Sequence, residues 1–420
     1  MFNLILVLSL FLPFQIALNP TQGIDLASIR VFIILLFFLW LANGLKNKRI
    51  VVKNNLVSAL IAVFLFLNLA SLAVSRNTDW SLRKLMFVFS IFPIYFVFVS
   101  AVGSKEKMEK VIKFLIWGGV AAALVGIIQF FLQFAIGLEK TYSFWAHYVI
   151  VPFLGNTFSG VVLENPSWLV NISGKTYLRA MSVFPDPHMF SFYLGLLIPL
   201  SLGLALRFKK ILYFLFFAVL GLADILTFSR GGYLGLLAGL LASLFVLWGR
   251  FGAKYKTISV LVVVLAVGIL FFPGPISNRL TSSLNLKEGS NAGRFEMWEK
   301  AYAVSLNNPF LGVGIGNYPL EVKPSADYRE PIYAHNTYLD IAAETGILNA
   351  VVWILIILVS IKSFLKKIKK DNLFFWLTIS LVVFSVHSIF ETAIYSPVVL
   401  TLLLIIISFA NIEIKNEETI

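Results

Sequence analysis

The sequence predicts an all-α membrane protein with about twelve transmembrane helices, and three observations support this fold class. Hydrophobic residues make up 59% of the 420 residues and charged residues 13%, about half the charged share of a soluble domain. The apolar residues come in runs of roughly 20, the length that a helix needs to cross a bilayer. Over such runs, helices keep the backbone polar groups satisfied in lipid.

Each apolar run predicts one span. The first run has no basic segment before it and no A-x-A cleavage site, and Pro13 interrupts it. We therefore interpret it as a membrane helix and not as a removed signal peptide. The predicted spans are 2–18, 25–44, 56–75, 85–102, 111–137, 187–206, 211–228, 231–249, 257–272, 337–361, 373–390 and 393–411.

These spans predict six parts of the chain. No internal repeat is visible, so an inverted-repeat transporter finds no support. The parts are five spans in 1–137, an extracytoplasmic loop at 138–186, spans six to nine in 187–272, a large extracytoplasmic loop at 273–336, spans ten to twelve in 337–411 and a cytoplasmic tail at 412–420.

The placement of positive charge predicts the orientation. The net charge is +13, but the basic residues lie in short clusters between apolar runs, so they indicate membrane topology and not nucleic-acid binding. Five basic loops fall on one side, which we assign to the cytoplasm together with both termini. The loop with Arg76, Arg83 and Lys84 is the exception, and only Asp79 compensates it in part.

Ionisable residues at the lip of a membrane helix are costly and therefore mark candidate sites. The first is Ser229-Arg230-Gly231-Gly232, between spans seven and eight. Its glycines let backbone amides approach an anion beside the guanidinium, whose planar fork suits phosphate oxygens. The alternative is an arginine that reaches the lipid headgroups, helped by Asp224.

The second candidate is Arg294, near the start of a short helix predicted from Gly293 to about Ser305. Arg294 lies at the centre of the apolar face, where a charge needs a buried or ligand-borne partner. The alternative is a structural ion pair with Glu321 or Glu330. The other residues of this face are Met297, Trp298, Ala301 and Ser305.

The third candidate is His335, just before span ten. Thr337 and Asp340 form a predicted capping box, which places His335 outside the helix at the membrane lip. An imidazole can take a proton near neutral pH. Asn336, Asp340 and Glu344 recur every four residues and form one stripe. The alternative for His335 is a hydrogen-bonded surface histidine.

The fourth candidate is Arg179 with His188. Asp186 and Pro187 are the expected N-cap and first residue of span six, which explains these two residues. Arg179 and His188 are left without such an explanation, so we take them as secondary candidates.

Together these segments resemble the O-antigen ligase and polymerase superfamily, although the first five spans match it only in being apolar. The matching motifs are SRGG at 229–232, GRFEMW at 293–298, NPFLGVGIGNYP at 308–319 and AHNTYLDIAAETGI at 334–347. The resemblance implies a GT-C-like membrane glycosyltransferase of a bacterial plasma membrane, which inverts configuration and uses no metal or other cofactor. It implies an O-antigen ligase-type enzyme that works at the periplasmic or outer face. The donor would be a glycan on a polyprenyl (undecaprenyl) diphosphate carrier, and the acceptor a glycolipid or glycan such as lipid A-core.

The resemblance also places the family's essential residues on Arg230, Arg294 and His335. Elementary chemistry agrees, because a diphosphate leaving group needs cations and an acceptor hydroxyl needs a base. The sequence has no D-x-D motif and no cluster with metal-ligand spacing, so no metal site is expected. The expected substrate-binding residues are Arg179, His188, Gly231, Gly232, Asn336, Asp340, Glu344 and Trp298.

Several alternatives stay open. Within the superfamily they are a polymerase of O-antigen or exopolysaccharide, or an oligosaccharyltransferase acting on protein. A metal-dependent enzyme would use an early acidic residue such as Asp25, which we interpret instead as the N-cap of span two. A flippase of lipid-linked sugar would need charges along a path through the membrane, and we count Asp224, His387 and Glu391 as charges within or next to spans, whereas the candidate site residues lie at one face.

Overall fold

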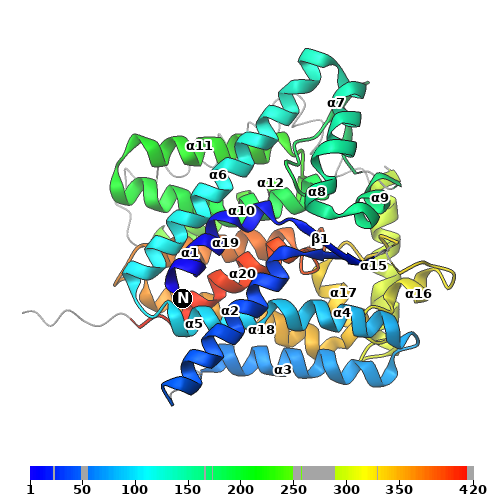
Figure 1. The fold of residues 1–420 in the computed structure, drawn as a ribbon, viewed down its shortest axis with the longest axis horizontal. Coiled ribbons are helices and arrows are strands. Elements are labelled where there is room, and N and C mark those ends of the chain that lie inside the picture. The colour runs from blue at the N-terminus through cyan, green and yellow to red at the C-terminus, as the bar shows by residue number, and fades with distance from the viewer. Residues whose placement is uncertain are drawn as a thin grey trace, which may run out of the picture.

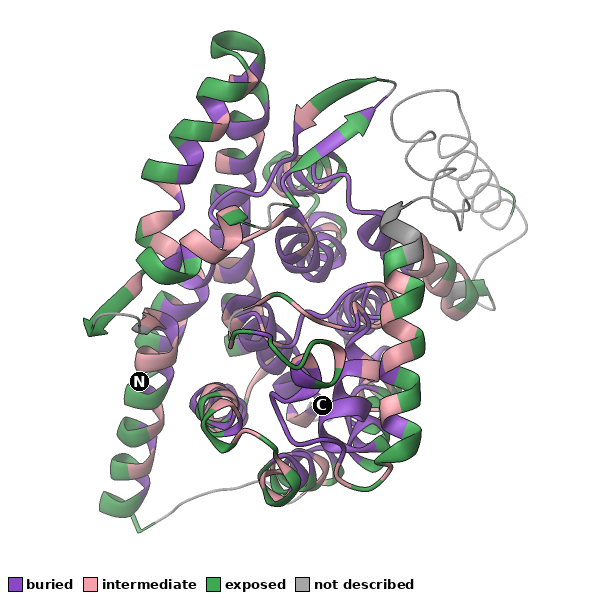
Figure 2. Cartoon of the chain, turned by 90° about the vertical axis from the view of Figure 1, so that its right-hand side faces the viewer, coloured by how far each residue is buried: buried purple, intermediate pink, exposed green. Residues whose placement is uncertain are grey.

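The computed structural model describes residues 1–21, 24–48, 55–164, 167–172, 174–248, 257, 289–328 and 330–413. Most of the long helices lie side by side, and short helices with two hairpins gather at one end of this bundle (Figure 1). Helix α15 runs across that end, which we call the site end. In Figure 2, which looks onto the site end, buried residues concentrate in the central helices.

The described residues contain six helices long and apolar enough to cross a membrane and five shorter apolar helices. These helices cover eleven of the predicted spans. The remaining span, 257–272, lies outside the described residues apart from Thr257. The chain is therefore a largely helical membrane protein, and the count of twelve spans stays a prediction.

The N-terminal part forms a layer of apolar helices. Its 32-residue helix α6 is the longest of them, and at 1.5 Å per residue it measures about 48 Å, more than a bilayer core. The elements are α1 (Phe2–Phe11), η1 (Leu12–Phe14), β1 (Ala17–Thr21), β2 (Ile24–Ala27), α2 (Ser28–Lys46), α3 (Leu56–Ala70), η2 (Ser71–Val74), α4 (Thr78–Ile91), α5 (Pro93–Ala101) and α6 (Lys105–Ile136).

The middle part combines the predicted extracytoplasmic loop with the central helices. The loop is folded into short helices and one hairpin. The elements are α7 (Leu138–Phe144), η3 (Trp145–Val149), α8 (Val151–Leu154), α9 (Asn156–Glu164), β3 (Leu169–Ile172), β4 (Lys175–Leu178), α10 (Pro187–Phe208), α11 (Ile211–Leu226) and α12 (Arg230–Leu247).

The C-terminal part carries the helix across the site end and the last spans. Its elements are α15 (Gly289–Asn307), α16 (Tyr318–Val322), α17 (Thr337–Thr345), α18 (Ile347–Lys367), α19 (Leu373–His387), α20 (Pro397–Ser408) and η6 (Phe409–Asn411). Predicted span ten is thus two helices. They part at Gly346, whose φ of +92° strongly favours glycine.

Close packing in the bundle centre depends on small residues. Helix α10 is almost entirely buried, and its start is as predicted, because Asp186 accepts from the amides of His188 and Met189. On α12, Gly235 and Gly239 recur at a spacing of four residues. A Cβ there would come within 2.8 Å of the Val383 carbonyl oxygen and 2.7 Å of its Cγ2. The glycines therefore let α12 approach α19 closely.

The glycine-rich loop at 308–317 fastens the large loop to the N-terminal part. Gly312, Gly314 and Gly316 all have positive φ, and a Cβ on Gly314 would lie 2.6 Å from Ser75. Asn317 completes the joint, because the Asn77 amide donates to its Oδ1 at 2.7 Å. The glycine-rich loop is therefore docked against the N-terminal part of the chain.

One prediction about the first spans is wrong. Asp25 does not cap α2; it lies in β2, and Ala27 occupies the N-cap. The Asp25 Oδ2 atom accepts from the Phe158 amide at 2.6 Å, so its carboxylate serves another helix start, that of α9. Two short antiparallel hairpins, β1–β2 and β3–β4, were not expected in an all-α chain.

Candidate active site

Glu391 joins two of the predicted functional residues. The Glu391 Oε1 atom lies 2.6 Å from His335 Nδ1, and its Oε2 atom lies 3.2 Å from Arg294 Nη2. Glu391 is in the connection between α19 and α20, Arg294 is on α15, and His335 precedes α17. Three segments far apart in the sequence therefore meet at one carboxylate.

The backbone at His335 is unusual. Its φ is +51°, in the left-handed region that non-glycine residues seldom adopt. Two contacts fix the loop there: the Thr337 amide donates to the Ser388 carbonyl at 2.9 Å, and Trp298 Nε1 donates to the His335 carbonyl at 3.4 Å. Such a conformation persists where the surroundings determine it, and it is frequent at functional sites.

Opposite charges shape the protonation of this pair. The charge of Glu391 raises the pKa of His335, against the opposing effects of burial and of Arg294. Burial alone would raise the pKa of Glu391, but His335, His188 and Arg294 hold it well below its usual range. The Glu391 side chain is 9% exposed and that of His335 36%. The result is a buried carboxylate that holds Nδ1 of a more exposed imidazole and leaves Nε2 for a reacting group.

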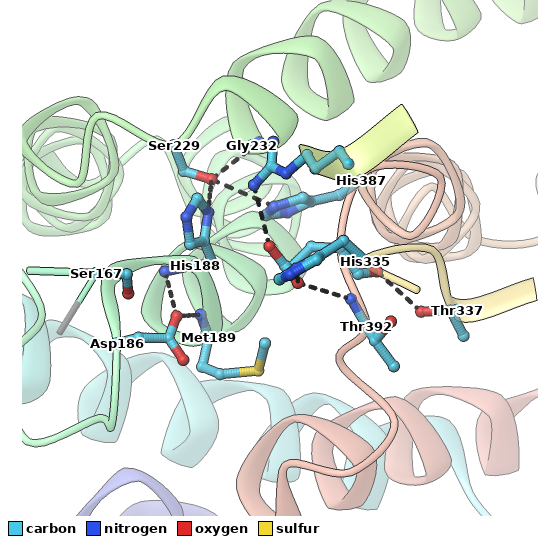
Figure 3. A network of polar contacts seen from close by, with 12 residues as sticks. Ser167, Asp186, His188, Met189, Ser229, Gly232, His335, Thr337, His387 and Thr392 are labelled. Carbon is cyan, nitrogen blue, oxygen red and sulfur yellow. Dashed lines mark hydrogen bonds and ion pairs between the residues drawn. The ribbon is translucent and has the colours of Figure 1, made fainter. Parts of the chain in front are cut away.

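A second polar network adjoins this pair (Figure 3). Ser229 Oγ lies 3.3 Å from His387 Nε2 and 3.2 Å from His188 Nδ1. A Cβ on Gly231 would come within 2.6 Å of the His387 ring. The two residues on either side of Arg230 therefore touch the histidine that precedes Glu391 by four positions.

Arg230 itself begins α12 and is only 5% exposed. Its neighbour Gly232 donates its amide to Ser229 Oγ at 3.3 Å and lies against Ser191, where a side chain would collide. The predicted SRGG turn is thus buried at the site end of α12, next to the Glu391 site. It is not an arginine at the lipid surface.

Arg179 has a structural explanation. Its Nε donates to the Thr227 carbonyl at 2.7 Å and its Nη1 to the Ser167 carbonyl at 2.9 Å, and the residue is 2% exposed. It therefore ties the loop before α10 to the end of α11. Its Nη1 also lies 3.4 Å from His188 Nε2, which connects this joint to the Ser229 network.

The helix α15 carries Arg294 on the face that the sequence predicted. Met297 and Trp298 are partly buried and Ala301 and Ser305 are buried, whereas Glu296 is exposed. The ion pair expected as the alternative forms with a different partner. Arg294 pairs with Glu391 and not with Glu321 or Glu330.

The polar stripe on α17 holds the neighbouring loops. The expected capping box is displaced by one residue, because Asn336 is the N-cap and accepts from the amides of Tyr338 and Leu339. Asp340 instead accepts from the Ala334 amide at 2.8 Å and from the Thr392 hydroxyl. Glu344 pairs with Lys84 at 2.6 Å. Asp340 therefore fixes the loops that carry His335 and Glu391, whereas Glu344 ties α17 to α4.

That ion pair also accounts for one of the three cations in the loop that breaks the charge pattern. Lys84 belongs to the one basic loop on the predicted extracytoplasmic side, and Glu344 neutralises it in a largely buried place. A cation that is paired inside the protein does not report on topology, because the positive-inside rule concerns charges in exposed loops.

Sequence reasoning missed Glu391 and His387 as site residues. Both were noted only as charges within spans. The signal that could have found them is their position at the end of an apolar run, where an ionisable side chain marks a functional site. Among the residues that the structure describes, no group of three or more His, Asp or Glu side chains is placed to hold a metal ion.

A family model described as O-antigen ligase matches residues 214–354. This segment runs from α11 into α18 and contains Arg230, Arg294 and His335. The match confirms the resemblance to the O-antigen ligase and polymerase superfamily and supports an enzyme. Glu391 lies beyond the matched segment. No curated protein matches the chain.

Proposed function

We propose that the chain is a glycosyltransferase of the ligase type. It moves a glycan from undecaprenyl diphosphate to a hydroxyl of an acceptor sugar, such as one on lipid A-core, at the outer face of a bacterial plasma membrane. The observation that carries the proposal is the contact of one buried carboxylate, Glu391, with both Arg294 and His335.

The arginines take the leaving group. A diphosphate leaves as a stable anion, so it needs positive charge and no general acid. Arg294 offers a guanidinium that is 20% exposed, and Arg230 lies in the adjoining turn. A planar fork can bind two phosphate oxygens at once, so Arg294 exchanges part of its contact with Glu391 for the diphosphate.

His335 takes the proton. Its Nε2 accepts the proton of the acceptor hydroxyl while the acceptor oxygen bonds to the anomeric carbon. The bond from that carbon to the diphosphate oxygen breaks with its electron pair on oxygen, and the configuration inverts. Glu391 holds the ring through Nδ1 and stabilises the imidazolium that forms, as a carboxylate partner of a catalytic histidine does.

The site's location favours transfer over transport. A flippase needs charges along a path that opens to each side in turn. Two of the three charges counted with the spans, His387 and Glu391, instead lie in two adjoining polar networks at the site end. The predicted orientation puts that end outside the cytoplasm, where finished glycans are available.

The test is transfer in vitro by purified protein in detergent. The donor is a defined undecaprenyl-diphosphate glycan, and lipid A-core, free glycan and an acceptor peptide are compared, each with and without EDTA. We expect transfer to lipid A-core that EDTA does not reduce, and loss of transfer in Arg230→Ala and Arg294→Ala. Extension of free glycan alone would identify a polymerase, modification of the peptide a protein transferase, and inhibition by EDTA a metal-dependent mechanism.

A further inference from the structure

An aromatic pair, Tyr333 and Tyr395, stands beside the proposed base. Tyr333 lies two residues before His335, and Tyr395 four residues after Glu391. Their rings stack with centroids 6.2 Å apart and planes inclined by 28°. The two loops that supply the base and its carboxylate therefore also supply a pair of stacked rings.

The burial pattern puts Tyr333 and His335 on one side of their loop. Ala334 between them is fully buried, whereas Tyr333 and His335 are both partly exposed. The exposed parts of Tyr333 and His335 are therefore separated along the chain by one buried residue.

Lys84 and Glu344 hold the second ring in place. Lys84 Nζ lies 3.5 Å from the centroid of the Tyr395 ring and 2.6 Å from Glu344 Oε1. The Tyr395 hydroxyl donates to Glu344 Oε2 at 3.0 Å. Because the cation and the carboxylate neutralise each other, this place offers rings and hydrogen-bonding oxygens without an excess of positive charge.

The contrast with the arginine side is chemical. Arg294 suits an anion, whereas stacked tyrosines beside a neutralised ion pair suit an uncharged molecule with an apolar face and hydroxyl groups. A sugar ring has this character, because its C–H groups pack on aromatic rings while its hydroxyls hydrogen-bond at the edge.

We propose that the Tyr333–Tyr395 pair is the binding subsite for the acceptor, and that it takes an uncharged sugar ring with a free hydroxyl directed at His335. This inference rests on the proposed glycosyl transfer. The acceptor then reaches the base along the 330–336 loop while the diphosphate is held from α15, so the two substrates do not compete for one place.

The experiment measures sugar binding directly, without donor. Saturation-transfer NMR on the full chain in detergent micelles uses four probes: glucose, galactose, N-acetylglucosamine and the anionic sugar glucuronate. We expect at least one neutral sugar to bind, and Tyr333→Ala to weaken its binding about tenfold through loss of the ring. Tyr333→Phe keeps the ring and should stay within about threefold. Tyr302→Ala, an exposed tyrosine on α15, is the matched control and should bind as wild type.

Three outcomes would overturn the subsite: no binding of any neutral sugar, preference for glucuronate, or equal binding by wild type and Tyr333→Ala. Misfolding is recognised separately, because undecaprenyl diphosphate should raise the melting temperature of Tyr333→Ala as much as that of the wild type. Failure of the proposed function looks different. In that case the wild type still binds sugar through Tyr333 but transfers no glycan.

Discussion

Two buried carboxylates at opposite ends of the bundle show what distinguishes a reactive site from a structural one. Asp371, between α18 and α19, receives Arg207 Nη1 at 2.8 and 2.9 Å, Lys105 Nζ at 2.8 Å and the Leu373 amide at 2.8 Å. Glu391, at the site end, shares its oxygens between Arg294 and the partly exposed ring of His335. Asp371 is saturated by fixed partners, whereas Glu391 acts on a partner that can still reach a substrate.

Removal of the ring that Glu391 orients should have the largest effect. We expect His335→Ala to lower the transfer rate by about 10²- to 10⁴-fold, because the acceptor hydroxyl loses its base. The protein should still insert and fold. The matched control is His147→Ala, an exposed histidine on η3, measured in the same transfer assay. Near-normal turnover of His335→Ala would show that the base is another group.

Replacement of Arg294, which contacts the other oxygen of Glu391, should reduce transfer almost as strongly. We expect Arg294→Lys to reduce transfer roughly a hundredfold, because a point charge cannot replace a planar fork at a diphosphate. The affinity for undecaprenyl diphosphate, measured by thermal shift, should fall in parallel. Unchanged affinity with slow transfer would assign Arg294 to the positioning of Glu391 alone.

Neutralising Glu391 should reveal the coupling of the two groups. Since Glu391 raises the pKa of His335, the wild-type rate should fall as the pH drops through that raised value and the ring becomes protonated. In Glu391→Gln the imidazolium is less stabilised, so this limb should move to lower pH, with a rate roughly 10- to 100-fold lower on the plateau. A pH–rate profile checks this, and an unmoved limb would exclude Glu391 as the partner of the base.

Neutralising Asp371, the carboxylate with fixed partners, should change the stability of the fold and leave glycan transfer unchanged. Burial alone would raise the pKa of Asp371, but the bonds from Lys105, the Leu373 amide and Arg207 hold it below its usual range. A carboxyl whose pKa is lower in the folded state than in the unfolded state stabilises the fold at pH values above its unfolded-state pKa. This stabilisation is lost as the pH falls through the folded-state pKa. We expect Asp371→Asn to lower the free energy of unfolding by roughly 2 kcal/mol at pH 7, measured by unfolding in detergent. The difference from wild type should be smaller below about pH 4. An altered pH limb of transfer would contradict this separation.

An exposed ion pair gives the smallest expected effect. Glu296 and Lys300 on α15 are 2.7 Å apart, with side chains 60% and 42% exposed, on the face away from Glu391. Glu296→Gln should leave transfer within about twofold of wild type and stability unchanged, because exposed pairs contribute little. A large loss of transfer would show that the outer face of α15 also contacts a substrate.

The features predicted from the sequence are those that depend on nearby residues. The helix start at Asp186 and Pro187 and the inner face of α15 follow from local spacing, and the apolar runs place the spans. The pairing of Glu391 with residues 56 and 97 positions away depends on tertiary packing, which no local pattern records. The role of Asp25 was predicted wrongly for the same reason. Local spacing suggested the N-cap of the helix that follows it, but Asp25 accepts from the amide of Phe158, which is distant in the sequence.

The position of Glu391 also has a consequence for biogenesis. The carboxylate belongs to the connection between α19 and α20, the last pair of apolar helices in the described part of the chain. A nascent chain inserted as far as α18 already carries both arginines and the histidine, but it lacks the carboxylate that joins Arg294 to His335. Activity should therefore arise only with the final insertion step, so a stalled intermediate cannot release glycan prematurely.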